Sequence, residues 1–214
     1  AAFSSITGDQ DQPLRVVNDG AELVVVEGIH GNASLTTSGN TLLSGESSYT
    51  GDTQIKADGE LKAGNDSALS PGSEITLDDG GVLNLDGYSN TIAGLLSGPK
   101  LQSTPGVVGL GEAGAATLSV GKGDFSGEIV GDGALRKFGQ GTLILSGANA
   151  YTGSTTVEDG VLALATGFGI PQASSTLVNG SGRLDLASNL IGQGEFRIDQ
   201  LSINEGGRLF VRAS

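Results

Sequence analysis

The most constraining feature of this sequence is a motif that occurs twice and contains leucines spaced by about 20 residues, within the range of solenoid repeats. Residues 43–55 read LSGESSYTGDTQI, and residues 145–157 read LSGANAYTGSTTV. In the second copy, the next matching leucines after Leu145 are Leu164 and Leu186. Such spacing is typical of solenoids because the backbone returns to the same angular position once per turn.

The spacing predicts an all-β fold, a right-handed parallel β-helix (β-solenoid) of about ten coils. The handedness follows from the general preference of parallel crossover connections. The leucines of the two copies are expected to point inward and stack along the axis; they are Leu43, Leu61, Leu83, Leu85, Leu143, Leu145, Leu162, Leu164, Leu184 and Leu186. A β-sandwich would also give short strands and frequent turns, but it explains neither the leucine register nor the repeat.

The rest of the sequence favours one β-helix segment, residues 1–214, with repeat units at 31–130 and 131–214. Short apolar bursts alternate with polar residues and end at Asp-Gly, Asn-Gly or Gly-Gly pairs, as strands and tight turns do. No helical apolar period extends beyond two turns, and no apolar run approaches the length of a membrane span. The chain does not begin with Met and has no signal peptide, so we expect it to be a processed piece of a longer protein.

Composition excludes several kinds of chemistry. The chain has no Cys and a single His, so it cannot form disulfides, Cys-ligated metal sites or His-His metal pairs. Its formal net charge of −13 argues against nucleic acid and anionic membrane as partners, because both require clustered Lys and Arg. We therefore expect no cofactor, no bound nucleic acid and no direct membrane insertion.

Residues 131–157 read GDGALRKFGQGTLILSGANAYTGSTTV. This stretch closely resembles the passenger-associated transport repeat of bacterial autotransporters: a Gly-rich start, a Leu-Lys pair, Gly-Gly-Thr-Leu, Leu-Ser-Gly, Asn-x-Tyr-Thr-Gly and Thr-Thr. The first copy departs from the pattern, because residues 41–45 (TLLSG) lack the preceding Gly and Ser47-Ser48 replaces the Asn. The motif covers about a third of the chain.

The resemblance implies a passenger domain of the type V secretion system, of the pertactin-like or self-associating adhesin type. Such a passenger would be exported by a C-terminal β-barrel translocator in cis, through the outer membrane of a Gram-negative bacterium. It would then lie at the cell surface or be secreted. The partners that this implies are a host surface component or another copy of the same protein.

Three features resemble catalytic or ligand sites, and each has a simpler interpretation. Residues 109–114 (GLGEAG) match the dinucleotide fingerprint, but a strand pattern rather than a helix follows them. His30 lies in a turn context, and the chain has no Gly-x-Ser-x-Gly elbow. Asp78-Asp79 precedes two glycines and indicates a turn rather than a calcium loop. We therefore assign no catalytic, cofactor-binding or metal-binding residue.

Aromatic and basic residues are the remaining candidates for contacts with a partner. Tyr49 and Tyr151 occupy the same place in the two copies; packing or capping is the favoured interpretation, and a surface binding role is the alternative. The candidate interaction residues are basic and lie in the less acidic second half of the chain: Arg136, Lys137, Arg197, Arg208 and Arg212. They could contact an acidic neighbour, including another copy; alternatively they are solvated charges on outer faces of the coils.

Three functions are compatible with the sequence. The first is a non-enzymatic surface passenger that adheres or self-associates through many weak contacts. The second is a passive stalk that presents an N-terminal effector such as a protease and nucleates folding during export. The third is a polysaccharide-acting β-helix enzyme, which would need clustered carboxylates with a basic partner on one face. We expect the first function, adhesion or self-association, and we expect no enzymatic activity.

Overall fold

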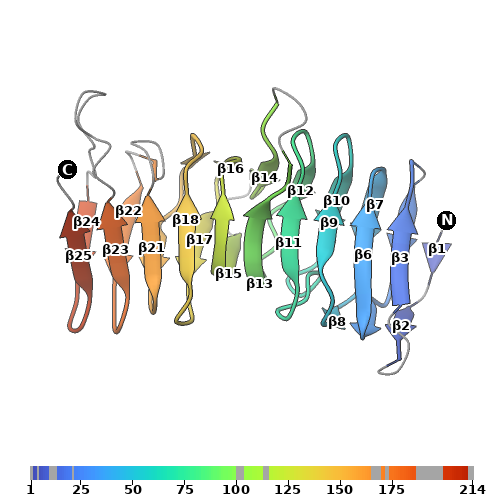
Figure 1. Ribbon diagram of the computed structural model, residues 1–214, viewed down its shortest axis with the longest axis horizontal. Helices are drawn as coiled ribbons and strands as arrows, with labels where there is room; N and C mark the ends of the chain where they lie inside the picture. Colours follow the sequence, from blue (N-terminus) through green and yellow to red (C-terminus); the bar gives the residue numbers. More distant parts are fainter. Residues whose placement is uncertain are drawn as a thin grey trace.

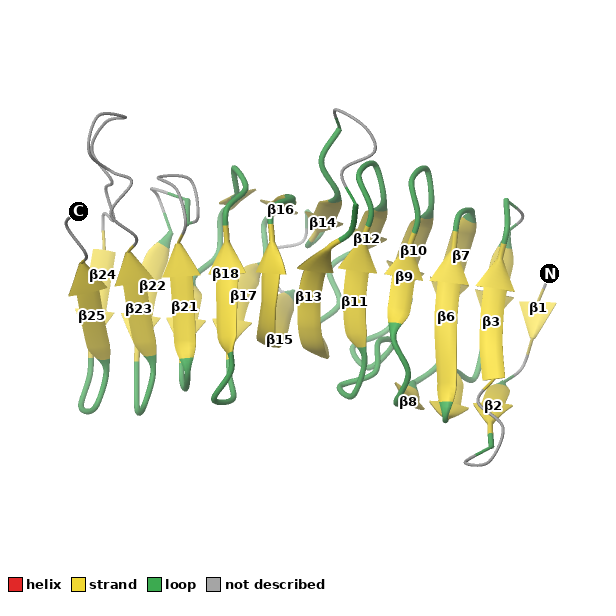
Figure 2. Cartoon of the chain, in the orientation of Figure 1, coloured by secondary structure: helices red, strands yellow, loops and turns green. Residues whose placement is uncertain are grey.

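The computed structural model is a rod of stacked β-strands (Figures 1 and 2). It describes residues 2–211 except 4, 10–13, 21, 100–103, 113–115, 165–169, 172–173 and 187–199. These described residues form strands and turns with no helix, and so none that could cross a membrane. Every strand pairing among them is parallel. The predicted parallel β-solenoid is confirmed.

The strands belong to three sheets that run along the rod. The eight-stranded sheet contains, in order, β1 (Ala2–Phe3), β4 (Leu23–Val25), β7 (Asn40–Leu43), β10 (Glu60–Ala63), β12 (Val82–Asn84), β14 (Val107–Gly109), β16 (Glu128–Gly131) and β19 (Ala150–Tyr151). The 14-stranded sheet contains β3 (Leu14–Asn18), β6 (Ala33–Thr37), β9 (Thr53–Ile55), β11 (Glu74–Leu77), β13 (Asn90–Ser97), β15 (Thr117–Phe125), β17 (Ala134–Lys137), β18 (Thr142–Leu145), β20 (Thr155–Val157), β21 (Val161–Leu164), β22 (Ser175–Val178), β23 (Arg183–Leu186), β24 (Gln200–Ile203) and β25 (Arg208–Val211). The three-stranded sheet contains β2 (Ile6–Gly8), β5 (Ile29–Gly31) and β8 (Ser48–Tyr49).

Leucines stack in register to form the interior. Leu143, Leu162 and Leu184 are direct partners on the successive strands β18, β21 and β23, and the exposed Leu209 continues the column on β25. The strands alternate buried and partly exposed residues because side chains point to opposite faces of a strand. All ten leucines expected to point inward are buried, with exposed fractions of 7% or less. This part of the sequence prediction is confirmed.

The turns of the solenoid differ in length. The longest path of paired strands in the 14-stranded sheet contains ten strands, from β3 to β24, each stacked on the strand of the turn before. Long turns occur in the middle of the chain, where Val82 pairs with Val107 and Asn90 pairs with Leu118. Both of these turns are longer than the leucine spacing predicts.

The long middle turns also rotate the second repeat copy relative to the first. Strand β7 of the first copy lies in the eight-stranded sheet, whereas its sequence equivalent β18 lies in the 14-stranded sheet. The change of sheet occurs at β15, which pairs with β17 through residues 117–120 and with β18 through residues 123–125. The column of paired residues that contains Leu42 therefore reaches Ala150 in the second copy, and not Ile144, which is the sequence equivalent of Leu42.

Candidate interaction surface on the second repeat copy

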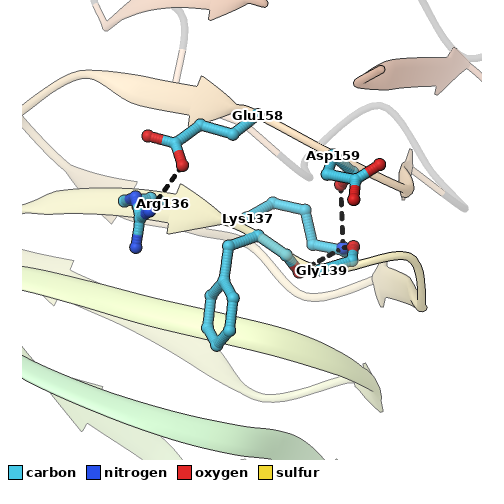
Figure 3. Close-up of polar contacts among 6 residues, drawn as sticks. Arg136, Lys137, Gly139, Glu158 and Asp159 are labelled. Atoms are coloured by element: carbon cyan, nitrogen blue, oxygen red, sulfur yellow. Dashed lines mark hydrogen bonds and ion pairs between the residues drawn. The ribbon is translucent and has the colours of Figure 1, made fainter. Parts of the chain in front are cut away.

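Arg136 lies on the outer face of β17, where the carboxylate of Glu158 on the neighbouring turn neutralises its charge. Its Nη2 donates a hydrogen bond to Oε2 of Glu158, and its guanidinium carbon lies 5.4 Å from the centre of the Phe138 ring (Figure 3). This hydrogen bond raises the pKa of Arg136 and lowers the pKa of Glu158. Both side chains remain about 40% exposed, so water screens the pair and its net contribution to stability is small.

Lys137 is buried, which corrects its prediction as a surface contact residue. Its Nζ donates hydrogen bonds to the carbonyl oxygens of Phe138 (2.7 Å), Gly139 (2.6 Å) and Asp159 (3.0 Å), as Figure 3 shows. Burial lowers the pKa of the amine to about 8, and the nearby Asp159 carboxylate acts in the opposite direction. The side chain therefore cannot reach a partner protein in this structure; it satisfies carbonyls at a corner of the rod.

The alternation of the strand explains this burial. Leu135 and Lys137 both point inward on β17, and the first copy has Leu35 and Thr37 at the corresponding places on β6. Thr37 Oγ1 donates to the carbonyl oxygen of Gly39 at 2.7 Å, as Lys137 does to that of Gly139. The second copy needs a longer donor, since its corner contains two more residues, Gln140 and Gly141.

Arg208 lies in a groove that crosses the last turns of the described chain. It is the register partner of Arg183, so the two arginines lie side by side on β25 and β23. Figure 1 shows these two strands as neighbours. Arg183 Nη2 donates to Asp185 Oδ2 at 2.7 Å, and its guanidinium carbon lies 3.7 Å from the centre of the Phe210 ring. Arg208, by contrast, forms no ion pair with a carboxylate within the described residues.

The groove beside these arginines has a volume of about 510 Å³. Its lining includes Gln140, Asp159 and Ser181 in addition to the two arginines, with glycines between them. A second, smaller hollow of about 270 Å³ lies next to Phe138 and is also lined by Pro71 and Lys122. The loop from Phe138 to Gly141 contributes residues to both hollows.

An acidic hollow lies on a different part of the rod. Asp86, Asn84 and Glu112 line a space of about 830 Å³ along β12 and β14. Lys62 pairs with Asp86 at 2.9 Å across neighbouring turns, and that contact raises the pKa of Lys62. Lys62 therefore neutralises part of the negative charge at one edge of the hollow.

The other candidate residues are placed as follows. Arg197 and Arg212 lie outside the described residues. Tyr49 and Tyr151 are buried, and their hydroxyls form hydrogen bonds with Thr53 Oγ1 (2.7 Å) and Thr155 Oγ1 (2.6 Å), which confirms the packed interpretation. Burial raises the pKa of both tyrosines.

The residues of the apparent catalytic and ligand motifs lie in or beside strands and contact neighbouring turns. The fingerprint-like residues 109–114 are followed by strand β15, as expected, rather than by a helix. His30 on β5 contacts Ser48 Oγ through Nδ1 (2.9 Å) and the Glu27 carbonyl oxygen through Nε2 (3.2 Å). Asp78 is buried and pairs with Lys56 at 3.4 Å. No group of three or more potential metal ligands occurs among the described residues.

Arg183 and Phe138 were not among the candidates from sequence reasoning. A signal for the arginine was present: Gly182-Arg183-Leu184 recurs as Gly207-Arg208-Leu209, one turn later. Phe138 directly follows the buried Lys137, the last residue of β17. It is the first residue of the loop 138–141, and its ring lines the hollow there.

Comparison with known proteins identifies a repeat family and a relative. The family model of the passenger-associated-transport-repeat matches residues 38–63 and 135–164. The adhesin BmaC autotransporter of Brucella suis biovar 1 (strain 1330) is 34% identical over 151 residues. That match covers 67% of this chain but 4% of the relative, so the chain spans only a small fraction of the relative's length. No solved structure matches the chain significantly.

Proposed function

Because this chain is a segment of an autotransporter passenger with two passenger-associated-transport-repeats, we propose that it is a non-enzymatic adhesive rod. A passenger of this kind lies at the cell surface or is secreted. The observation that carries the proposal is the match to an autotransporter named as an adhesin, together with a solenoid whose outer faces carry many polar side chains. The expected partner is a host surface component or another copy of the same protein.

The form of the rod supports adhesion by many weak contacts. Outward residues on three successive strands, Thr36, Gln54 and Thr76, place polar side chains next to one another along the rod. An exposed ion pair or hydrogen bond on such a surface contributes about 1 kcal/mol or less. Many such contacts, on many displayed copies, bind with an avidity that one contact cannot supply.

The distribution of carboxylates supports a non-enzymatic role. Glu74 pairs with Lys122, Asp86 with Lys62, and Glu158 with Arg136, each pair on a different part of the rod. Glycoside hydrolysis requires two carboxylates that flank one bond, with the acid and base a few ångströms apart. The carboxylates of these three pairs instead lie apart along the surface, and Asp86, which shares a hollow with Glu112, is paired with Lys62.

Self-association is a second candidate, favoured by the charge distribution. The groove with Arg183 and Arg208 and the acidic hollow with Asp86 and Glu112 lie at different positions along the rod. The basic groove of one copy could therefore face the acidic hollow of another. Since the chain carries a net charge of −13, whole rods repel, and we expect a Kd on the order of micromolar or weaker.

Display on living cells tests the proposal. Bacteria that display the complete passenger should attach to a host cell layer, or clump, more than the same strain without it. Sedimentation of the purified chain across a salt series measures self-association separately. If displaying cells neither attach nor clump and the chain is strictly monomeric, the adhesive role is wrong and the stalk function is supported.

A further inference from the structure

We propose that the second repeat copy binds an acidic glycan, a polysaccharide strand with isolated carboxylates, along the corner between Phe138 and Arg208. The inference rests on the proposed adhesive function and specifies the ligand class for that surface. The binding surface consists of the Phe138 hollow, the loop 138–141 and the groove of Arg183 and Arg208, and is called the corner trough below.

The arginine pair supplies the anion-recognising part of the trough. Like charges directly opposite one another on neighbouring strands repel, yet Arg183 and Arg208 are register partners. Asp185 and the Phe210 ring hold the Arg183 guanidinium, whereas Arg208 has no carboxylate partner within the described chain. A bound carboxylate would relieve the repulsion and accept two parallel hydrogen bonds from a planar guanidinium.

Phe138 supplies an apolar contact for a sugar ring. The ring borders a hollow of about 270 Å³ that is lined mostly by small residues, with Lys122 at its edge. Arg136 lies against this ring at 5.4 Å, which limits its freedom to move. A partly exposed aromatic side chain among charged groups can cover the C–H bonds of a sugar while neighbouring polar groups bind its hydroxyls.

Between Phe138 and the arginine pair, the corner trough is lined by side chains that can form hydrogen bonds with the hydroxyl groups of a sugar. Gln140 and Ser181 offer both donors and acceptors, and Asp159 offers a carboxylate acceptor. A dense polyanion would be repelled by Asp159 and by the net charge of −13, whereas isolated carboxylates can reach the arginines without that cost. This combination favours a glycan over an acidic peptide, whose carboxylates lack accompanying hydroxyls.

Glycines keep the floor of the trough open. Gly160, Gly180 and Gly206 line it, all with positive φ. A Cβ atom at Gly160 would lie 2.4 Å from the carbonyl oxygen of Gly139, and one at Gly206 would lie 2.2 Å from that of Gly180. Close stacking of the turns therefore excludes side chains here, and the resulting hollow extends across neighbouring turns.

Binding of defined oligosaccharides to the whole chain tests this inference. Calorimetry would use a hyaluronan hexasaccharide, in which every second sugar carries a carboxylate, with a chitin hexasaccharide as the neutral probe and a glutamate hexapeptide as the acidic peptide. We expect the hyaluronan probe to bind and the other two to bind at least about tenfold more weakly. The chitin probe lacks the carboxylate that would bond an arginine, and the peptide lacks the sugar contacts.

Single substitutions with matched controls locate the site. Arg208→Gln should weaken hyaluronan binding about tenfold, and Arg15→Gln, the same change on exposed strand β3, should leave it unchanged. Phe138→Ser should weaken binding by severalfold, whereas Tyr88→Ser, at another exposed aromatic residue, should not. Unfolding curves of each variant separate loss of binding from loss of folding.

The outcomes separate this inference from the proposed function. Equal binding of the glutamate peptide, equal binding of the neutral probe, or no effect of Arg208→Gln would overturn the glycan site, and a peptide preference would favour a protein partner such as a second copy. If cells adhere through the passenger but the chain binds no hyaluronan probe, only this inference fails. If the chain binds the probe but cells do not adhere, only the adhesive function fails.

Discussion

The amine of Lys137 donates a 3.0 Å hydrogen bond to the carbonyl oxygen of Asp159, which lies on the next turn of the solenoid. Two further carbonyl oxygens, those of Phe138 and Gly139, accept from the same amine. One side chain thus joins two neighbouring turns at a corner just beyond the end of the paired strands. Its contribution can be measured in several ways.

Lys137→Ala should lower the free energy of unfolding by about 2–4 kcal/mol, since it removes a buried aliphatic stem and leaves three carbonyls without their donor. Lys137→Met should have a smaller effect because it refills most of the volume. Denaturant unfolding measures both. The control is Lys62→Ala, whose exposed ion pair should contribute about 1 kcal/mol or less; an equal loss at both positions would contradict the assigned role of Lys137.

The same amine predicts a pH dependence of stability. Its pKa is lowered to about 8 in the folded chain, below the ordinary value of 10.5, so the unfolded chain binds more protons between these two values. The free energy of unfolding of the natural chain, relative to Lys137→Met, should therefore rise as the pH increases from about 8 to 10.5. Chemical denaturation of both proteins at several pH values measures this difference, which would stay flat if the amine had an unshifted pKa.

The two buried tyrosines should both stabilise the chain through their hydroxyls. Tyr49→Phe and Tyr151→Phe each remove a hydroxyl that bonds a threonine four residues later, and each should cost about 1–2 kcal/mol. Tyr49 should cost more, because its threonine partner also contacts Ser73 Oγ at 3.0 Å. Thermal unfolding gives the comparison. Tyr88→Phe is the exposed control, and a loss there as large as at Tyr151 would refute the packing argument.

Leu145→Asp should destabilise the chain by several kcal/mol or prevent folding. It would place a carboxylate with no partner in the stacked interior, between the strands that contain Phe125 and Leu164. Thr142→Asp introduces the same group at an exposed position of the same strand and should change stability little. Circular dichroism during thermal unfolding distinguishes the two, and a folded Leu145→Asp chain of natural stability would disprove the inward orientation.

The purified chain should show no hydrolytic or lytic turnover. Pectins, glycosaminoglycans and generic peptides are expected to stay uncut over hours, because the carboxylates of the Glu74, Asp86 and Glu158 ion pairs lie on different parts of the rod. Chromatography of the incubated substrates provides the measurement. Turnover that a single Asp or Glu substitution abolishes would establish an enzyme.

Much of the fold could be predicted from sequence because it depends on local alternation and a regular period. The inward leucines and the packed tyrosines follow from those two patterns. The lengths of individual turns could not be predicted, since the long turn between Asn90 and Leu118 does not follow the leucine period.

The surface was harder to predict than the core. Lys137 is a charged residue, and its type suggests exposure, but its position on the strand places it inside and backbone carbonyls satisfy its amine. Arg208 lies in a groove only because glycines on neighbouring turns leave space, which depends on stacking between residues far apart in the sequence. Contacts between turns therefore decide which basic residues are accessible.

The rotation of the second repeat copy means that one motif faces two directions. β7 and β18 carry equivalent residues but lie in different sheets of the rod. A flat partner that recognises this motif can engage only one copy at a time, so the other copy remains available to a second partner. Two flat surfaces that each bound one copy of the motif would therefore lie on different sides of the rod.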